Sequence, residues 1–229
     1  MTVFLLYLPL WLLALLLWIL LRKRAYTACP YFFAYVAFGV AASVARFVAR
    51  NHTAPYYATY WVTEAGYCLL GILAMYEVCR LALGKLPRAW WAGLIFPVIL
   101  LASIGMSLAR TNADATHFAR RLTSHIVLGE IAVRFVQVFI FAGLATIAAL
   151  IGLRWRRYPF GVALGFGLYA TFMLLTTTRF ADLGTKFNFV WGLSSVAAYS
   201  VAVFIWIWFF AMPAADAEPE SRTLGPLRP

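Results

Sequence analysis

Residues 3–21 read VFLLYLPLWLLALLLWILL, a run that contains no charged side chain. A helix needs roughly 20 consecutive apolar residues to cross a hydrocarbon core of about 30 Å. Inside a bilayer only a helix or a closed barrel pairs every backbone N–H and C=O group, so the run predicts a transmembrane helix. It has neither a charged start nor a small-residue cleavage site, and we therefore do not interpret it as a secretory signal.

Six further apolar runs follow the first, and together they predict an all-α bundle of seven transmembrane helices. Arg50 and Pro55 belong to the predicted loop between the second and third spans. The tail, residues 213–229, is rich in Pro, Ala and Glu, and we expect it to be disordered. The single transmembrane domain covers residues 1–212, with spans at 3–21, 31–47, 58–83, 89–109, 126–153, 158–178 and 188–212.

The composition agrees with a membrane protein. Hydrophobic residues make up 64 % of the chain and charged residues only 12 %, against about 25 % charged in soluble domains. The mean hydropathy is +0.84. The net charge of +11 comes from basic residues dispersed at the ends of the spans, where they set orientation, and not from a patch that could follow a phosphate backbone. We therefore expect the lipid bilayer as a partner and no nucleic acid.

The basic residues also predict an orientation. The loops after the first, third and fifth spans, with the tail, hold eleven Lys and Arg residues, and the loops after the second, fourth and sixth hold seven. Arg134 is not counted because it lies within a predicted span. The positive-inside tendency places the N-terminus outside and the tail in the cytoplasm.

Ionisable residues within the spans predict a polar pocket in the outer half of the bundle. A charge near the bilayer centre costs at least about 2.5–3.5 kcal/mol, so such a residue faces the bundle interior and has a partner. Glu130 precedes Arg134 by four positions, which puts both on one helix face. The candidate ligand-binding residues at this outer level are Arg46, Glu64, Glu130, Arg134, Gln137 and Arg179.

These candidates support two interpretations that do not exclude one another. Three arginines and two glutamates leave one positive charge in excess, which suits a small anionic ligand or a lipid headgroup. The alternative is an internal network of ion pairs that holds helices together, with Arg46 and Arg179 reaching toward the interface.

Three other features have simpler interpretations. Glu77 and Arg80 lie three residues apart near the inner end of the third span, where we expect a local ion pair, with a gate as the alternative. Gly161 and Gly165 have the G-x-x-x-G spacing, which predicts close internal helix packing. The aromatic residues around Tyr60, like those at the other span ends, belong to the aromatic belt of the interface, with no binding role.

The sequence contains none of the catalytic motifs that we sought, among them G-x-S-x-G, H-E-x-x-H and the Walker loop. We predict no catalytic residue, no metal site and no cofactor. Lys186 lies before the seventh apolar run and not within it, which argues against a retinal Schiff base. The three histidines lie in outer loops or at a helix start, so they do not form the facing pair at depth that binds haem.

Three stretches resemble an uncharacterised family of seven-helix integral membrane proteins of soil bacteria that has no known activity. They are Tyr57–Glu64 (YATYWVTE), Gly129–Arg134 (GEIAVR) and Tyr158–Gly165 (YPFGVALG). The likeness extends over most of the chain. It implies a multi-pass protein of the bacterial inner membrane and nothing about mechanism.

We therefore expect a non-enzymatic inner-membrane protein, sensory or ligand-binding, with a polar outer-half pocket for a small anionic or lipid-like ligand. One alternative is a small permease, which would need a second polar constriction at Glu77 and Arg80. Another is a structural subunit that binds other membrane subunits. A lipid-modifying enzyme that uses Glu64 or Glu130 as acid or base is the third.

Overall fold

The structure is a computed structural model that describes residues 2–83, 133–146, 157–181 and 188–212, without the side chains of 2–7, 53–54, 83, 177–181 and 188–191. Within these ranges the chain is helical and contains no strand. The helices are α1 (Thr2–Arg22), the short 3₁₀ turn η1 (Ala25–Thr27), α2 (Pro30–Ala49), α3 (Thr53–Leu83), the helical segment Val133–Thr146, α6 (Arg157–Ala181) and α7 (Asn188–Ala211).

Four of the described helices are long and apolar enough to cross a membrane, as expected of an all-α membrane protein. The qualifying stretches are Pro30–Ala49, Pro55–Ala82, Arg157–Thr176 and Gly192–Ala211. The described apolar parts of α1 (Leu8–Arg22) and of the fifth predicted span (Val133–Thr146) are shorter. The predicted span 89–109, both ends of the predicted span 126–153 (residues 126–132 and 147–153) and the tail 213–229 lie outside the described residues.

The third helix begins earlier than hydropathy predicts. α3 starts at Thr53, whereas the predicted span starts at residue 58, and the His52 carbonyl already accepts a hydrogen bond from the Tyr56 N–H at 2.9 Å. Pro55, which we had assigned to the loop, therefore lies in the first turn. A helix tolerates proline there because the missing N–H would have no partner inside the helix. Hydropathy marks the apolar part of a helix and not its polar first turn.

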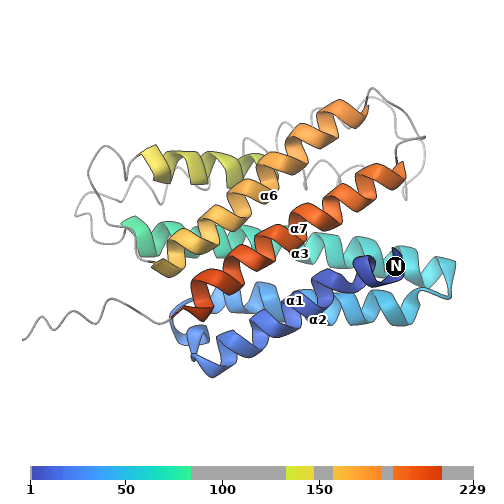
Figure 1. Cartoon of the computed structure of the whole chain (residues 1–229), viewed down its shortest axis with the longest axis horizontal. Coiled ribbons are helices and arrows are strands. Elements are labelled where there is room, and N and C mark those ends of the chain that lie inside the picture. Colours follow the sequence, from blue (N-terminus) through green and yellow to red (C-terminus); the bar gives the residue numbers. More distant parts are fainter. Residues whose placement is uncertain (1, 84–132, 147–156, 182–187, 213–229) are drawn as a thin grey trace, which may run out of the picture.

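The five long helices form a closed ring of neighbours. Along the ring, α1 contacts α2, α2 contacts α3, α3 contacts α6, α6 contacts α7, and α7 returns to α1. Figure 1 shows that the turn from α2 to α3 and the N-terminus of α7 lie at one end of the bundle, which we call the α2–α3 end. The turn from α1 to α2 lies at the other end, with the C-terminus of α7; we call this the α1–α2 end.

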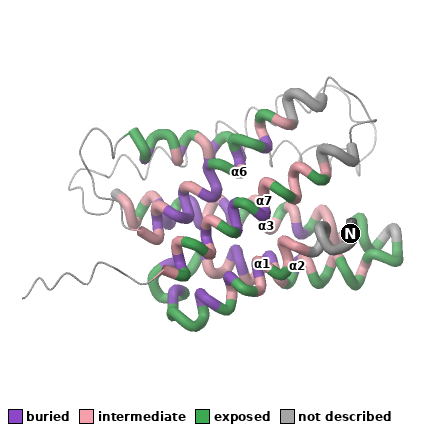
Figure 2. Tube along the Cα trace, in the orientation of Figure 1, coloured by how far each residue is buried: buried purple, intermediate pink, exposed green. Residues whose placement is uncertain are grey.

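Aromatic side chains fill the centre of the ring. The Trp206 indole of α7 is fully buried, and its ring centroid lies 5.2 Å from that of Phe32 on α2 and 4.9 Å from that of Phe166 on α6. In Figure 2 the buried residues lie along the sides of the helices that face one another, and the exposed residues lie outward. The outward surface is rich in large apolar side chains such as Trp11, Phe139 and Phe204, as lipid contact requires.

The G-x-x-x-G spacing acts in internal packing, as predicted. A Cβ atom added to Gly161 would lie 2.5 Å from Cγ of Phe209, and one added to Gly165 would lie 2.1 Å from Nε1 of Trp206. Both aromatic residues belong to α7, so the two glycines let α7 approach α6 more closely than any side chain would permit.

Candidate functional site

A cavity of about 650 Å³ opens among the helices toward the α2–α3 end. Its lining extends from Tyr35 of α2 to Arg50, the residue that follows this helix, which corresponds to about 22 Å along the helix axis at 1.5 Å per residue. On α3 it extends from Tyr56 to Cys68. α1, α6, α7 and the segment Val133–Thr146 contribute the remaining walls.

The cavity brings together four of the six predicted site residues, namely Arg46, Glu64, Arg134 and Gln137. Glu130 lies outside the described residues. Arg179 belongs to the last turns of α6, but its side chain is not among those described. Among the described lining residues, three arginines (Arg46, Arg50, Arg134) and Glu64 leave a formal excess of two positive charges.

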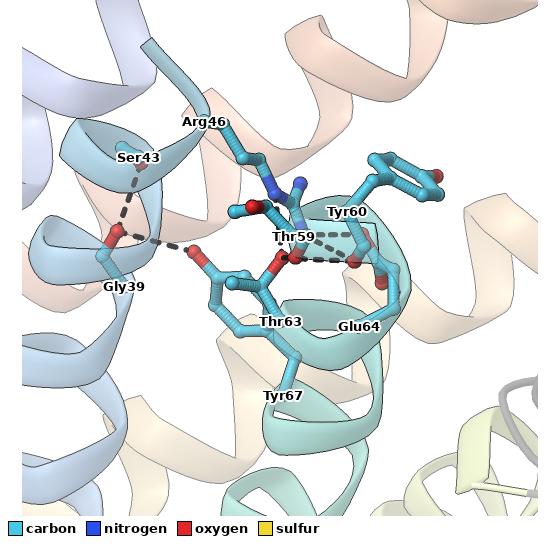
Figure 3. Close-up of polar contacts among 8 residues, drawn as sticks. All are labelled: Gly39, Ser43, Arg46, Thr59, Tyr60, Thr63, Glu64 and Tyr67. Carbon is cyan, nitrogen blue, oxygen red and sulfur yellow. Dashed lines mark hydrogen bonds and ion pairs between the residues drawn. The ribbon is translucent and has the colours of Figure 1, made fainter. Parts of the chain in front are cut away.

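Arg46 is held in one position from several sides. Its Nη2 atom forms an ion pair with Oε1 of Glu64 at 3.0 Å, and its Nε–H donates to Oγ1 of Thr63 at 2.7 Å. The guanidinium carbon lies 4.7 Å from the ring centroid of Tyr60 and 5.7 Å from that of Tyr67. Figure 3 shows these contacts from α2 to α3. They pin the two helices together, as the alternative interpretation of the charges predicts.

The same contacts leave part of the Arg46 guanidinium available. Its Nη1 atom makes no hydrogen bond to any residue that the structure describes, and Figure 3 draws it without a partner. Arg46 lines the cavity and keeps 23 % of its side-chain surface exposed. Because the other two nitrogens are fixed, an anion that binds Nη1 does not have to order the side chain, which favours binding.

Arg134 and Gln137 line the cavity from the segment Val133–Thr146. Arg134 is only 8 % exposed, and its guanidinium carbon lies 5.1 Å from the ring centroid of Tyr169 on α6. Gln137 is buried against α3, where its Nε2 lies 3.1 Å from the position that a Cβ of Gly71 would occupy. Gly71 therefore makes room for the amide, and any larger residue there would push Gln137 away.

Tyrosines line much of the cavity, and our sequence reasoning assigned none of them a role. Four of them, Tyr35, Tyr67, Tyr169 and Tyr199, come from α2, α3, α6 and α7. The Tyr67 hydroxyl donates to the Gly39 carbonyl at 3.3 Å, and the Tyr35 and Tyr67 ring centroids lie 5.6 Å apart. The residues around Tyr60, interpreted as interfacial belt, also contribute Tyr56 and Tyr60 to the lining.

A signal for this face is present in the sequence. Tyr60, Glu64 and Tyr67 follow one another at spacings of four and three, so they project from one side of α3. Ser195 and Tyr199 repeat a spacing of four on α7. Helical periodicity counted for polar and aromatic residues together, instead of for charges alone, would have located the tyrosines.

Glu77 has a further role besides the expected local interaction with Arg80. Its side chain is 1 % exposed, and its carboxylate accepts hydrogen bonds from the backbone N–H groups of Tyr31 at 3.3 Å and Phe32 at 3.0 Å. These donors belong to the first turn of α2, where the residue before the helix, Cys29, provides no side-chain cap. Glu77 thus caps α2 from α3, a contact that the sequence did not predict, and the charge of Arg80 also acts on its carboxylate.

A second cap lies at the same α1–α2 end. Nζ of Lys23 donates to the carbonyl oxygens of Ala211 and Met212, at 2.9 Å each. These carbonyls are at the end of α7, where the helix dipole favours a cation. Cys29 is buried nearby, and burial, with a smaller contribution from the Glu77 charge, raises the pKa of its thiol from 9.0 to about 12. The α1–α2 end is therefore tied together by polar contacts, whereas the α2–α3 end holds the cavity.

The described ranges contain no group of three or more His, Cys, Asp or Glu residues that could hold a metal ion. The cavity instead offers fixed cations, tyrosine hydroxyls and aromatic faces, which bind and orient a ligand. The chain matches no model of a known protein family, no curated protein and no solved structure. Its site is thus interpreted from its own geometry.

Proposed function

We propose that the chain is a seven-helix, multi-pass protein of the bacterial inner membrane that binds a small anionic, lipid-like ligand in the cavity, in a sensory or ligand-binding role without catalysis. The observation that carries this proposal is the environment of Arg46. A guanidinium fixed by Glu64, Thr63 and two tyrosine rings keeps Nη1 without a partner among the described residues, in a cavity that Arg50 and Arg134 also line.

The proposed orientation has the N-terminus outside, from the distribution of Lys and Arg residues. With that orientation the α2–α3 end faces the periplasm, and the cavity lies in the outer half of the bundle. The inner-membrane location derives from the resemblance to the soil-bacterial family. A cysteine introduced at His52, which is exposed in the turn between α2 and α3, should react with an impermeant maleimide added to intact cells.

The role of Glu77 favours binding over permeation. A permease would need a second polar constriction toward the cytoplasm, and we considered Glu77 and Arg80 for it. The Glu77 carboxylate instead accepts the N–H groups of Tyr31 and Phe32, and an acceptor engaged in this way cannot serve a passing ion without uncapping α2.

The test uses the full chain in phosphatidylcholine nanodiscs. Radiolabelled laurate should bind with saturation, whereas radiolabelled dodecyltrimethylammonium, of similar chain length and opposite charge, should not. Arg46→Gln should lower the affinity for laurate roughly tenfold or more, because it removes a charge-assisted hydrogen bond.

Arg22→Gln is the matched control. Arg22 also lies over an aromatic ring, 5.3 Å from the centroid of Trp18, but it does not line the cavity. It should bind laurate as the unmodified chain does. Equal binding of the cationic and anionic amphiphiles, or equal loss in both variants, would show that the cavity does not select an anion.

A further inference from the structure

Thr63 of α3 is buried, and its hydroxyl connects the backbone of α3 to Arg46 of α2. The hydroxyl oxygen lies 2.8 Å from the carbonyl oxygens of both Thr59 and Tyr60, and 2.7 Å from Nε of Arg46 (Figure 3). A carbonyl only accepts and a guanidinium N–H only donates. The hydroxyl proton therefore points to the carbonyls, and an oxygen lone pair is left to accept from Arg46.

The contacts of Arg46 decide how a ligand can bind to it. An arginine binds an anion most strongly through two neighbouring nitrogens at once, either Nε with Nη2 or Nη1 with Nη2. Both pairs need Nη2, which lies 3.0 Å from Oε1 of Glu64 and 3.5 Å from the Tyr60 carbonyl oxygen. Nη1 makes no hydrogen bond to any residue that the structure describes. A ligand anion is therefore bound through Nη1, and a single donor does not align itself with the anion as a two-nitrogen pair does.

The direction of Nη1 thus depends on what holds the other two nitrogens. Glu64 holds Nη2 and Thr63 holds Nε. Glu64 lines the cavity, so its removal would change both the charge and the wall of the cavity. Thr63 carries no charge and is not among the described residues that line the cavity. A change at Thr63 therefore reaches a ligand only through Arg46.

We infer that Thr63 is the positioning residue of the anion site: its hydroxyl holds Nε of Arg46, which fixes the direction in which Nη1 meets the ligand, and Thr63 does not touch the ligand itself. This inference rests on the proposed function, because it concerns the arginine of the same site.

Thr63→Val tests the inference on the full chain in phosphatidylcholine nanodiscs with radiolabelled laurate. Valine replaces the hydroxyl by a methyl group of similar size, so binding must then order the Arg46 side chain. The affinity for laurate should fall roughly two- to tenfold. Thr63→Ser keeps the hydroxyl and should bind laurate within about twofold of the unmodified chain. Equal affinities of the valine and serine variants would overturn the inference.

Thr171→Val is the matched control. The Thr171 hydroxyl of α6 donates to the Gly167 carbonyl, four positions earlier, at 2.7 Å. This is the same contact within one helix that Thr63 makes with Thr59, and Thr171 is not among the described lining residues either. Thr171→Val should leave laurate binding unchanged. A loss equal to that of Thr63→Val would show that any threonine hydroxyl within a helix has this effect, and would overturn the inference.

A double variant distinguishes positioning from a general structural role. Arg46→Lys keeps a positive charge for laurate but has no Nε–H for Thr63 to hold. When Thr63→Val is added to Arg46→Lys, the affinity for laurate should change by less than about twofold. The full loss of the single Thr63→Val variant in this background would show that Thr63 does not act through Arg46.

The remaining outcomes separate this inference from the proposed function. If Thr63→Val cannot be purified as a folded protein by circular dichroism and gel filtration, Thr63→Ala decides with the same readout. Laurate binding that depends on Arg46 and not on the Thr63 hydroxyl overturns the positioning role and leaves anion binding intact. If the unmodified chain does not bind laurate, the proposed function itself is wrong, and the role of Thr63 falls with it.

Discussion

Substitution of Gly165 by alanine tests whether the close approach of α6 and α7 holds the bundle together. The added Cβ would lie 2.1 Å from Nε1, 2.7 Å from Cε2 and 2.8 Å from Cδ1 of Trp206. Normal contact needs about 3.5 Å or more, so the indole must move by more than 1 Å. It cannot move freely, because it is fully buried and packs against Phe32, Tyr35 and Phe166.

The magnitude follows from three contributions. Overpacking of a filled core costs about 1–3 kcal/mol. The hydrogen bond from Trp206 Nε1–H to the Val162 carbonyl, 3.3 Å long, is lost or weakened at about 0.5–1.5 kcal/mol. Alanine favours the helix over glycine, which by itself stabilises the folded state by about 0.8–1.0 kcal/mol. We therefore expect Gly165→Ala to lower the free energy of unfolding by about 2 kcal/mol, within a range of roughly 0.5–4 kcal/mol.

Gly143→Ala provides a matched control. Gly143 also lies within a helix, but a Cβ added there meets nothing within 4 Å among the described residues. The same substitution should therefore leave stability unchanged or raise it by up to about 1 kcal/mol. Stability is measured by reversible unfolding in mixed micelles with increasing SDS, followed by tryptophan fluorescence and circular dichroism.

The double variant Gly165→Ala with Trp206→Phe sharpens the test. The smaller ring removes the colliding Nε1 edge, so its combined loss should be less than the sum of the single losses. Equal stability of Gly165→Ala and Gly143→Ala would show that contact with Trp206 does not limit the side chain at position 165. Strict additivity with Trp206→Phe would show that the two residues do not touch.

Two further predictions concern the α1–α2 end. Glu77→Ala leaves the N–H groups of Tyr31 and Phe32 without their acceptor and should lower the free energy of unfolding by about 2–4 kcal/mol in the same SDS assay. Arg80→Ala, at an exposed position on the same helix, is the control and should be nearly neutral. Similar losses in both variants would exclude the cap. The Cys29 pKa is raised to about 12, so this thiol should not react with iodoacetamide in the folded protein at pH 8. Cys68, which lines the cavity, should react instead. Peptide mass spectrometry measures the label at each cysteine. Rapid labelling of Cys29 at pH 8 would contradict its burial. The raised pKa of Cys29 also makes the free energy of unfolding depend on pH: its contribution is fully present below about pH 9 and should be lost as the pH rises toward 12.

The sequence predicted helix termini well where one residue type marks them. The ends of α1 and α2, at Arg22 and Pro30, lie within one residue of the predicted ends because a charge and a proline mark them. The structure begins α3 at Thr53, before the predicted span start at residue 58, because polar first-turn residues do not register in hydropathy. The pairing of Glu77 could not be read locally, since its partners Tyr31 and Phe32 lie more than forty positions away.

The candidate site was predictable in part. Ionisable residues within apolar runs must face the bundle, so Arg46, Glu64 and Arg134 were expected at an interior site, and the structure places all three around one cavity. Tyr35 and Tyr199 were not expected, because a tyrosine within a span is equally at home at a lipid interface, in a core or in a cavity wall. Only the rotation of α2 and α7 about their axes distinguishes these cases.

The all-α membrane class can be predicted from local sequence alone, because the length and polarity of a spanning helix depend only on bilayer thickness and on pairing of the backbone within each segment. Which helix faces meet becomes visible only in the folded bundle. Those contacts depend on how side chains interlock between distant segments, as when Gly165 admits Trp206 and Arg46 reaches Glu64. Lipid is about as apolar as a helix surface, so hydropathy does not select among the alternative pairings of helix faces, and close packing and hydrogen bonds do.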